Sequence, residues 1–338
     1  MFTARKPAGG VLRVAAVAVA TTLLAAGCGI LDGSSGDESG GNGQVEKPNV
    51  RIGIIASVDD APVKVAEKLG FFKEEGLNAE VKLFQSASQT MPALSNGDLD
   101  FSLMNYVTYF QAASAKTLDA KIVADAYQGS PEALVMLARP GLTIASAKDF
   151  EGKKVSVHQP AGNIADLLFR ATLRDNGADP SKVNYVPVAF PNIPKALETG
   201  QIDAGIAIEP FMTTAQKNSG AQRVLKVISG PTQDMPLSGY VSPSKFAQEN
   251  PKTVAAFQRA MTKAQQAAGD RAKLAQVMPE LTGVDEATVP LLNLGVFPTS
   301  LDATRLQRVI SLMESYPDLS KLTERIQASS FIYNPPGS

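Results

Sequence analysis

The sequence predicts an α/β protein made of two doubly wound lobes joined by a two-segment hinge. The first observation is a repeated phrase, since residues 93–100 (ALSNGDLD) recur as residues 196–203 (ALETGQID), a spacing of 103 positions (196 − 93). Both copies match a helix end, a glycine C-cap and the start of a short strand. The second observation is that strand and helix patterns alternate around both copies, as in parallel sheets. One repeat at this spacing indicates two similar lobes with a ligand cleft between them.

Each lobe shows three strand patterns with a helix between successive strands. Apolar runs and alternating residues predict the strands, and glycine after a helical pattern marks where each helix ends. Pro62 suits the first turn of a helix because its missing N–H is not needed there. In the first lobe we expect strands at 50–55, 79–84 and 99–103 and helices at 62–69 and 89–96. In the second lobe we expect strands at 154–158, 183–188 and 202–208 and helices at 164–175 and 195–199.

Two further segments are expected to cross between the lobes, an apolar strand at 133–138 and a returning segment at 237–241. The remaining chain reads as helices that pack on the first lobe, over 251–269, 271–278 and 301–314. Two linkers favour a hinge motion that opens and closes the cleft. The expected organisation is a signal peptide (1–28), a flexible tether (29–47), a discontinuous first lobe (48–138 and 238–331) and an inserted second lobe (139–237).

The N-terminus has the composition of an export signal. Basic residues accompany an apolar run, Val14–Leu24, that is too short for a comfortable membrane span. The run leads into Leu-Ala-Ala-Gly-Cys, which resembles a bacterial lipobox and implies that Cys28 is acylated, with palmitate among its chains. The alternative is an ordinary signal peptide with a chance cysteine. The Gly/Ser/Asp-rich residues 29–45 cannot bury a core and read as a tether. We therefore expect a lipid-anchored protein on the extracytoplasmic face of the cell membrane, with no other membrane contact.

The composition argues against several classes of function. The chain carries 32 Lys and Arg against 33 Asp and Glu, so its charge does not point to nucleic acid. A single Cys and a single His argue against disulfides, a metal site and a Cys/His dyad. His158 could still serve a Ser-His-Asp site, but a lone His disfavours hydrolysis. We expect a monomeric binding protein that is not an enzyme and has no catalytic residues, metal or cofactor.

Ligand contacts are expected in the turns that follow strands, because small molecules bind beyond the carboxyl ends of strands in α/β sheets. Two of these turns precede helices, whose free N–H groups favour an anion or a carbonyl. An amide beside an aromatic ring, as in Asn105 and Tyr106, suits a small planar ligand. The candidate ligand-binding residues are Ser57, Asp59, Asp60, Gln85, Asn105, Tyr106, Gln128, His158, Gly162, Asn163, Phe190 and Glu209.

Several of these residues have a structural alternative. Asp59 and Asp60 could cap a helix instead of accepting a hydrogen bond from a ligand nitrogen. The two repeated carboxylates, Asp100 and Asp203, are expected to be structural and to accept backbone N–H groups from a neighbouring turn. The remaining alternatives are a capping Asn105, a core-packed Tyr106 and Phe190, a strand-end His158 and a Glu209 that braces the hinge.

Four motifs together carry a family resemblance. Residues 62–77 (PVKVAEKLGFFKEEGL) fit the pattern AxxxGxFxxxGL, residues 93–100 fit ALxxGxxD, and residues 149–155 (DFEGKKV) and 196–211 (ending in Glu-Pro-Phe) follow in order. This arrangement resembles the solute-binding receptors of ABC importers, in the branch that includes sulfonate, taurine and nitrate receptors and thiamin-pyrimidine-precursor proteins. The resemblance implies a type II periplasmic-binding-protein fold and delivery of a ligand to an ABC permease.

The resemblance leaves two ligand classes and two other functions open. The family's hydroxyl-rich anion cradle is replaced by residues 158–163 (HQPAGN), in which Pro160 lacks a donor. This replacement, with the acidic Asp59 and Asp60, favours a pyrimidine-like heteroaromatic over a sulfonate-like oxyanion, whereas the absence of Trp disfavours a stacked ring. The functional alternatives are a membrane-tethered sensor module of the same fold without transport, and an enzyme related to the pyrimidine synthases that share the fold.

Overall fold

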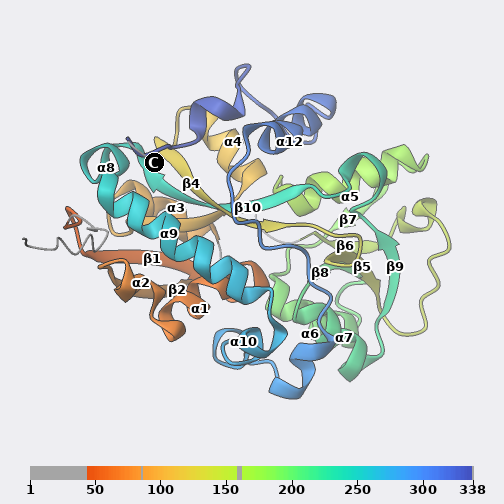
Figure 1. Cartoon of the computed structure of the whole chain (residues 1–338). Helices are drawn as coiled ribbons and strands as arrows, with labels where there is room; N and C mark the ends of the chain where they lie inside the picture. The colour runs from red at the N-terminus through yellow and green to blue at the C-terminus, as the bar shows by residue number, and fades with distance from the viewer. Residues whose placement is uncertain (1–43, 85–86, 158–161, 337–338) are drawn as a thin grey trace, which may run out of the picture. The chain divides into compact units, whose positions relative to one another are not determined.

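Two five-stranded sheets carry the fold (Figure 1). The computed structural model describes residues 44–84, 87–157 and 162–336 of the 338-residue chain. Strands and helices alternate along most of this part of the chain. The predicted α/β class with two sheets is therefore confirmed.

The first sheet is mostly parallel, with one antiparallel strand inserted near its middle. β1 pairs in parallel with β2 and β3, whereas β10 runs antiparallel to both β3 and β4. The late strand β10 therefore joins parts of the sheet that the early chain supplies. The strand order is β2 (Asn78–Phe84), β1 (Asn49–Ile55), β3 (Phe101–Asn105), β10 (Pro236–Pro243) and β4 (Ala120–Gln128).

The second sheet has the same plan and is built from one continuous stretch of chain. β6 pairs in parallel with β7 and β8, and β5 runs antiparallel to β8 and β9. The sequence places residues 133–138 at the end of the first lobe, but β5 pairs only within this second sheet. The first crossing between the sheets therefore precedes β5. The strand order is β7 (Asn184–Tyr185), β6 (Lys154–Ser156), β8 (Ala204–Ile208), β5 (Leu134–Ala138) and β9 (Gln222–Lys226).

Twelve α-helices pack around the sheets in the described residues. The predicted helix at 164–175 has the same bounds in the structure, and the long helix predicted at 251–269 ends one residue earlier. The helices are α1 (Ala61–Leu69), α2 (Phe71–Glu74), α3 (Ala87–Ser95), α4 (Tyr106–Ser114), α5 (Ile164–Asp175), α6 (Ile193–Glu198), α7 (Phe211–Ser219), α8 (Ser244–Glu249), α9 (Pro251–Ala268), α10 (Arg271–Ala275), α11 (Met278–Thr282) and α12 (Ala303–Ser315).

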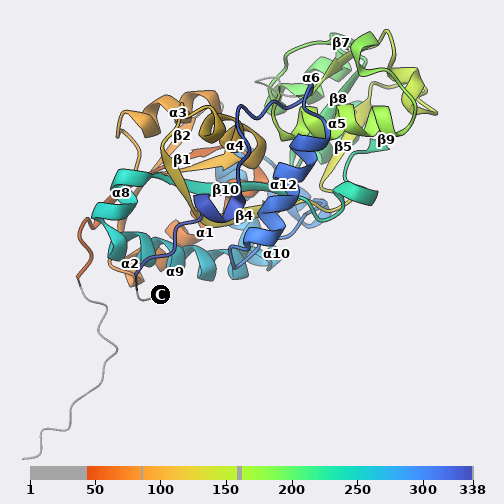
Figure 2. The same cartoon turned by 90° about the horizontal axis from the view of Figure 1, so that it is seen from above.

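The C-terminal helices pack mainly on the first sheet, as Figure 2 shows for α9 and α12. α9 crosses one face of that sheet, where the ring of Phe257 stacks on Phe101 with centroids 3.9 Å apart and also faces Phe72. α12 packs against α4 and β10, and just beyond it Tyr316 and Asp318 bond to the end of α5. The C-terminal chain therefore contacts elements of both sheets.

The repeated phrase has the same structure in both halves. Ile52 of β1 pairs with Phe101, and Val155 of β6 pairs with Ala204, so both partners are shifted by 103 positions (155 − 52 and 204 − 101). The carboxylate of Asp100 accepts the backbone N–H of Arg51 at 2.9 Å. The expectation that the repeated aspartates are structural is confirmed, although their backbone partners lie at neighbouring strands and not in turns.

The second copy repeats this bond. Asp203 accepts the backbone N–H of Lys154 at 3.0 Å, again 103 positions after its counterpart (154 − 51). Each aspartate therefore fixes the register between the first and third strands of its sheet.

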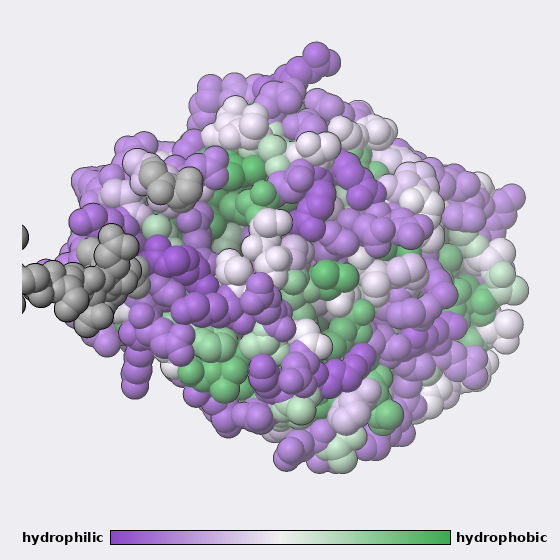
Figure 3. Space-filling model, viewed as in Figure 1, coloured by the Kyte–Doolittle hydropathy of each residue, from purple (hydrophilic) through white to green (hydrophobic). Residues whose placement is uncertain are grey.

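The face of the molecule shown in Figure 3 is mostly hydrophilic, with separate hydrophobic patches. Three large apolar side chains are prominently exposed in the described residues, those of Leu83, Leu291 and Val296. In the described part of the chain, no helix has the length and apolar character needed to cross a bilayer.

Candidate functional site

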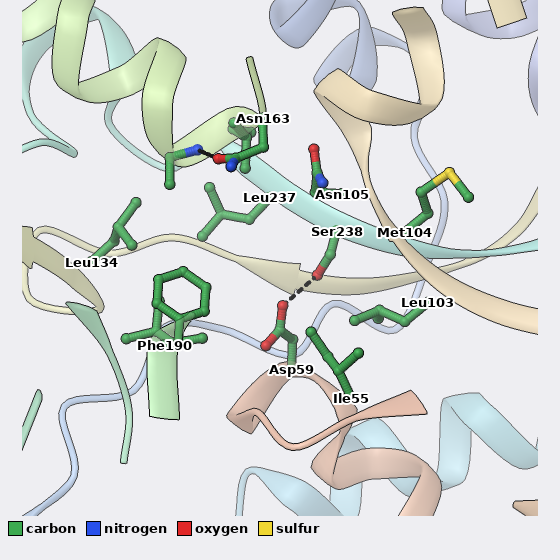
Figure 4. Close-up of a pocket in the computed structure, with 13 residues that line it drawn as sticks. Ile55, Asp59, Leu103, Met104, Asn105, Leu134, Asn163, Phe190, Leu237 and Ser238 are labelled. Atoms are coloured by element: carbon green, nitrogen blue, oxygen red, sulfur yellow. Dashed lines mark hydrogen bonds between the residues drawn. The ribbon is translucent and has the colours of Figure 1, made fainter. Parts of the chain in front are cut away.

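A cavity of about 70 Å³ lies between the two sheets (Figure 4). Three of its lining residues, Ile55, Asn105 and Ile208, are the last residues of strands β1, β3 and β8. This is the edge where ligands bind in open α/β sheets. The volume holds roughly five water molecules, which suits a small solute. The lining residues are Ile55, Asp59, Leu103, Met104, Asn105, Leu134, Asn163, Ile164, Ala165, Phe190, Ile208, Leu237 and Ser238.

Asp59 supplies the carboxylate of the cavity. It belongs to the 3-10 turn Val58–Asp60 that follows β1, and its side chain is partly exposed to the cavity. One carboxylate oxygen accepts the hydroxyl of Ser57 at 2.6 Å, and the other accepts the hydroxyl of Ser238 at 3.0 Å, as Figure 4 shows for Ser238. Burial raises the pKa of Asp59, and the two hydroxyl bonds offset part of that increase.

Asp60 lies next to this carboxylate but faces away from the cavity. It is fully buried and accepts the backbone N–H of Ile55 at 2.7 Å, which closes the turn after β1. Burial raises its pKa well above the ordinary value, and the neighbouring charge of Asp59 raises it further. Neither aspartate forms a side-chain capping bond to the helix that follows, so the capping alternative is not observed.

Two asparagine amides line the cavity from opposite halves. Asn105 ends β3 and caps α4, since its carbonyl oxygen accepts the N–H of Thr108 at 2.9 Å. Asn163 caps α5 by accepting the N–H groups of Ala165 and Asp166. A primary amide has two N–H donors and two acceptor lone pairs, so a capping amide retains capacity for a ligand. The expected capping role of Asn105 and its expected place in the cavity wall are therefore compatible.

The rest of the cavity wall is mainly apolar. Phe190 enters from the turn before α6, and Leu134 and Ile208 come from the paired strands β5 and β8. Leu237 and Ser238 come from β10, which links the second half back to the first sheet. Such a wall strengthens electrostatic interactions inside the cavity because it excludes water.

Four of the twelve candidate residues line this cavity, namely Asp59, Asn105, Asn163 and Phe190. Ser57 lies behind Asp59 and positions it. Gln85 and His158 lie outside the described residues. The other candidates bond elsewhere in the fold: Asp60 to Ile55, Tyr106 to Asp125, Gln128 to Arg305, Gly162 to Asp166, and Glu209 to Thr213 and Asn293.

Tyr106 and Glu209 illustrate why position after a strand is a weak guide to a ligand contact. Tyr106 is fully buried and donates its hydroxyl to Asp125 at 2.8 Å. Glu209 is also fully buried and accepts both the backbone and the side-chain N–H of Asn293, at 2.8 and 3.0 Å. Glu209 therefore bonds to a segment 84 positions later, whereas Tyr106 joins α4 to β4 within one sheet.

The sequence gives no sign of several cavity residues. Ser238 lies on a strand whose pairing partners are more than a hundred residues earlier, so its contact with Asp59 depends on the tertiary fold. Leu134, Leu237 and Ile208 read as ordinary core residues. Within the described ranges, no group of three or more His, Cys, Asp or Glu side chains is arranged to hold a metal ion.

Comparisons with known proteins give a family and relatives. The family described as NMT1/THI5 like matches residues 57–275. The taurine-binding periplasmic protein of Escherichia coli K12 is 26% identical over 262 residues, which cover 75% of this chain and 78% of that protein.

Two solved structures share the fold. The alkanesulfonate-binding protein SsuA of Xanthomonas axonopodis pv. citri, solved with bound MOPS, superposes with a TM-score of 0.71 at 17% identity over 85% of this chain and 99% of that one. The periplasmic nitrate-binding protein NrtA of Synechocystis PCC 6803 gives a TM-score of 0.70 at 17% identity, over 83% of this chain and 84% of that one. These likenesses confirm the predicted periplasmic-binding-protein fold.

Proposed function

Because the chain belongs to the NMT1/THI5-like family, we propose that it is an extracytoplasmic solute-binding receptor that delivers a small organic molecule to an ABC-type importer. The observation that carries the proposal is the cavity, since both sheets contribute to its wall at the carboxyl ends of their parallel strands. The taurine-, alkanesulfonate- and nitrate-binding relatives support the same class of function. The family match agrees with the resemblance found in the sequence.

We place the solute between two lobes that close around it. The first lobe contains β1–β4 and β10 with the C-terminal helices, and the second contains β5–β9. A ligand that contacts both lobes better in the closed state shifts the population toward closure without any catalytic step. Asp59 and Asn105 would contact it from the first lobe, and Asn163 and Phe190 from the second.

The attachment to the membrane belongs to this proposal as well. Acylation of Cys28 would hold the receptor at the outer face of the membrane beside its permease, and residues 29–47 would act as the tether. Changing Cys28 to Ser should move the protein from the membrane fraction to the soluble fraction. Continued membrane association of that variant would contradict lipid anchoring.

The relatives and the sequence leave two solute classes for the test, a sulfonate-like oxyanion and a pyrimidine-like heteroaromatic. Residues 29–338 should be titrated with taurine, ethanesulfonate, nitrate and 4-amino-5-hydroxymethyl-2-methylpyrimidine while thermal unfolding is followed. A ligand at one hundred times its Kd should stabilise the folded state by about 2.7 kcal/mol.

Binding should depend on the cavity between the sheets. A tryptophan at Ile208 would fill this cavity and should abolish the ligand-induced shift in Tm. A tryptophan at Leu291, which is 61% exposed and does not line the cavity, is the matched control and should leave the shift unchanged. Absence of binding by every compound, or binding that the Ile208 change leaves intact, would contradict the proposed site.

A further inference from the structure

The charge of the cavity is unbalanced. Its wall contains the carboxylate of Asp59, and none of the thirteen lining residues that the structure describes is Lys, Arg or His. The other polar side chains of the wall are the amides of Asn105 and Asn163 and the hydroxyl of Ser238, which are neutral. Among the described lining residues, a solute that enters the cavity therefore meets one negative charge and otherwise neutral groups.

The hydrogen bonds of Asp59 position this charge without neutralising it. Its donors are the hydroxyls of Ser57 at 2.6 Å and Ser238 at 3.0 Å, together with the backbone N–H of Asp59 itself. Ser57 precedes the turn and Ser238 comes from β10, so the carboxylate is fixed from two elements. A carboxylate has about four acceptor positions, and the two hydroxyls occupy two of them. The carboxylate retains capacity for a donor that arrives with the solute.

The apolar part of the wall makes that capacity important. A carboxylate held among side chains such as Phe190, Leu134 and Ile208 has lost much of its hydration. A buried charge is tolerated poorly unless it is paired and hydrogen-bonded. A solute that brings a donating nitrogen supplies the missing partner, whereas a purely anionic solute places a like charge beside Asp59.

We propose that Asp59 determines the specificity of the receptor: it selects a small organic solute whose ammonium or amino nitrogen donates to this carboxylate and whose carbon skeleton packs against the apolar wall. This inference rests on the proposed receptor function and narrows its solute class. Amino-sulfonates and aminopyrimidines meet the requirement. Nitrate, and alkanesulfonates that lack an amino group, do not meet it.

The test uses pairs of probes that differ only in the amino group. Taurine is compared with ethanesulfonate, and 4-amino-2-methylpyrimidine with 2-methylpyrimidine. Binding to residues 29–338 is measured by calorimetric titration at pH 7.5, about one pH unit above the ordinary pKa of His. We expect the amino-bearing member of at least one pair to bind at least tenfold more tightly than its partner. If ethanesulfonate, 2-methylpyrimidine or nitrate binds as tightly as the best amino-bearing probe, the inference is overturned.

Substitution of the carboxylate connects the selectivity to Asp59. Asp59→Asn should weaken binding of the amino-bearing probe at least tenfold, and it should leave binding of the partner without the amino group unchanged or tighter. Asp98→Asn removes the same charge from an exposed position before β3, at the end of that strand opposite to Asn105, and should change neither affinity. Equal loss for both members of a pair in Asp59→Asn would mean that this residue only maintains the fold of the site.

A second variant covers the case in which Asp59→Asn fails to fold. Ser238→Ala keeps the carboxylate but removes one of the hydroxyls that position it. It should weaken binding of the amino-bearing probe by a smaller factor and leave binding of its partner unchanged, while an unchanged preference would count against the inference. Failure of every probe, with or without an amino group, to bind the unmodified protein would contradict the receptor function itself.

Discussion

The two halves of the molecule repeat one framework but use its equivalent positions differently. The helix after the first strand begins at Ala61 in one half and at Ile164 in the other, again 103 positions apart (164 − 61). The third strand ends at Asn105 in the first half and at Ile208 in the second, and both residues line the cavity. The same backbone position therefore presents an amide from one side and an apolar side chain from the other.

The residue after each of these strand ends follows a second shared rule. Tyr106 and Glu209 are both fully buried and both brace the fold, but over different distances: Tyr106 joins α4 to β4 of its own sheet, whereas Glu209 bonds to Asn293, 84 positions later. Equivalent positions thus keep their geometrical role, facing the cavity or bracing the fold, while their chemistry differs. The difference concentrates the charge of the cavity in the first half, at Asp59, and much of its apolar surface in the second.

The largest expected effect distinguishes the two repeated aspartates. The side chain of Asp100 is 3% exposed and pairs with Lys47 and Arg51, whereas that of Asp203 is 23% exposed and pairs with Arg139. Changing Asp100 to Ala should lower the free energy of unfolding by about 2 kcal/mol, because it removes the charge-assisted hydrogen bonds that this buried carboxylate accepts from the partly exposed Lys47 and Arg51. The same change at Asp203 should lower the free energy of unfolding by about 1 kcal/mol. Urea denaturation of both variants measures the difference, and equal losses would show that burial does not distinguish the two copies.

The next comparison concerns the equivalent strand ends in the cavity wall. Asn105→Ala should weaken ligand binding about tenfold, which corresponds to the loss of roughly one net hydrogen bond. It should also lower the free energy of unfolding by about 1 kcal/mol, because the N-cap of α4 is lost. Ile208→Val removes one methylene and should change affinity less than threefold, at a stability cost of about 1 kcal/mol.

Asn105→Ser serves as the control, because serine is also a favoured N-cap residue. It should recover much of the lost stability without recovering the affinity. An unchanged affinity in Asn105→Ala would mean that this amide is only a cap.

Smaller and equal effects are expected at the glycines that end the repeated helices. Gly97 and Gly200 have φ angles of 76° and 70°, and a Cβ added at either one would meet no atom within 4 Å. Alanine at either position is strained by its backbone conformation alone, which costs about 1 kcal/mol. Thermal unfolding should therefore show nearly equal decreases in Tm, and a clear difference would indicate that the two helix ends are not equivalent.

The smallest effect is a change in how stability depends on pH, and it has opposite signs at two carboxylates. Burial raises the pKa of Asp60 above its unfolded value, so the stability that it contributes is complete below the unfolded pKa and is lost as the pH rises through the folded pKa. Burial would also raise the pKa of Asp100, but hydrogen bonds from Arg51 and Lys47 outweigh it and lower that pKa. The stability from Asp100 is therefore present above its unfolded pKa of about 3.9 and is lost as the pH falls through the lower folded value.

Denaturation experiments between about pH 3 and pH 8, a range that includes the unfolded pKa of Asp, would measure the direction of the pH dependence at both carboxylates. The stability of Asp60→Asn relative to the unmodified protein should rise with pH. The deficit of Asp100→Asn should be largest near neutral pH and should shrink in acid. Parallel curves for the two variants would contradict the assignment.

Much of the framework could be predicted because its signals are local. The repeated phrase, the helix 164–175 and the structural role of Asp100 and Asp203 follow from periodicity, glycine caps and strand-edge chemistry. The third strand was harder to delimit: the apolar run predicts 99–103, whereas β3 spans Phe101–Asn105, since Asp100 still belongs to the connection. The placement of β5 in the second sheet also needed the structure, because an apolar strand does not reveal its partners.

The cavity was predicted less completely than the fold. Asp59, Asn105, Asn163 and Phe190 were accessible from their places after strands. Ser238 was not, since its role depends on a contact with a residue 179 positions earlier. For the same reason, the sequence could not separate cavity residues from bracing residues such as Tyr106 and Glu209, which differ in the direction of the side chain.

The position of β10 has a consequence for the order in which the chain can fold. β5 to β9 all lie within residues 134–226, so the second sheet has its full set of strands before β10 is synthesised. The first sheet must wait, because β10 at 236–243 separates β3 from β4. The half that leaves the ribosome first therefore completes its sheet last: β1, β2 and β3 can pair with one another early, whereas β4 and the second edge of β3 wait for β10.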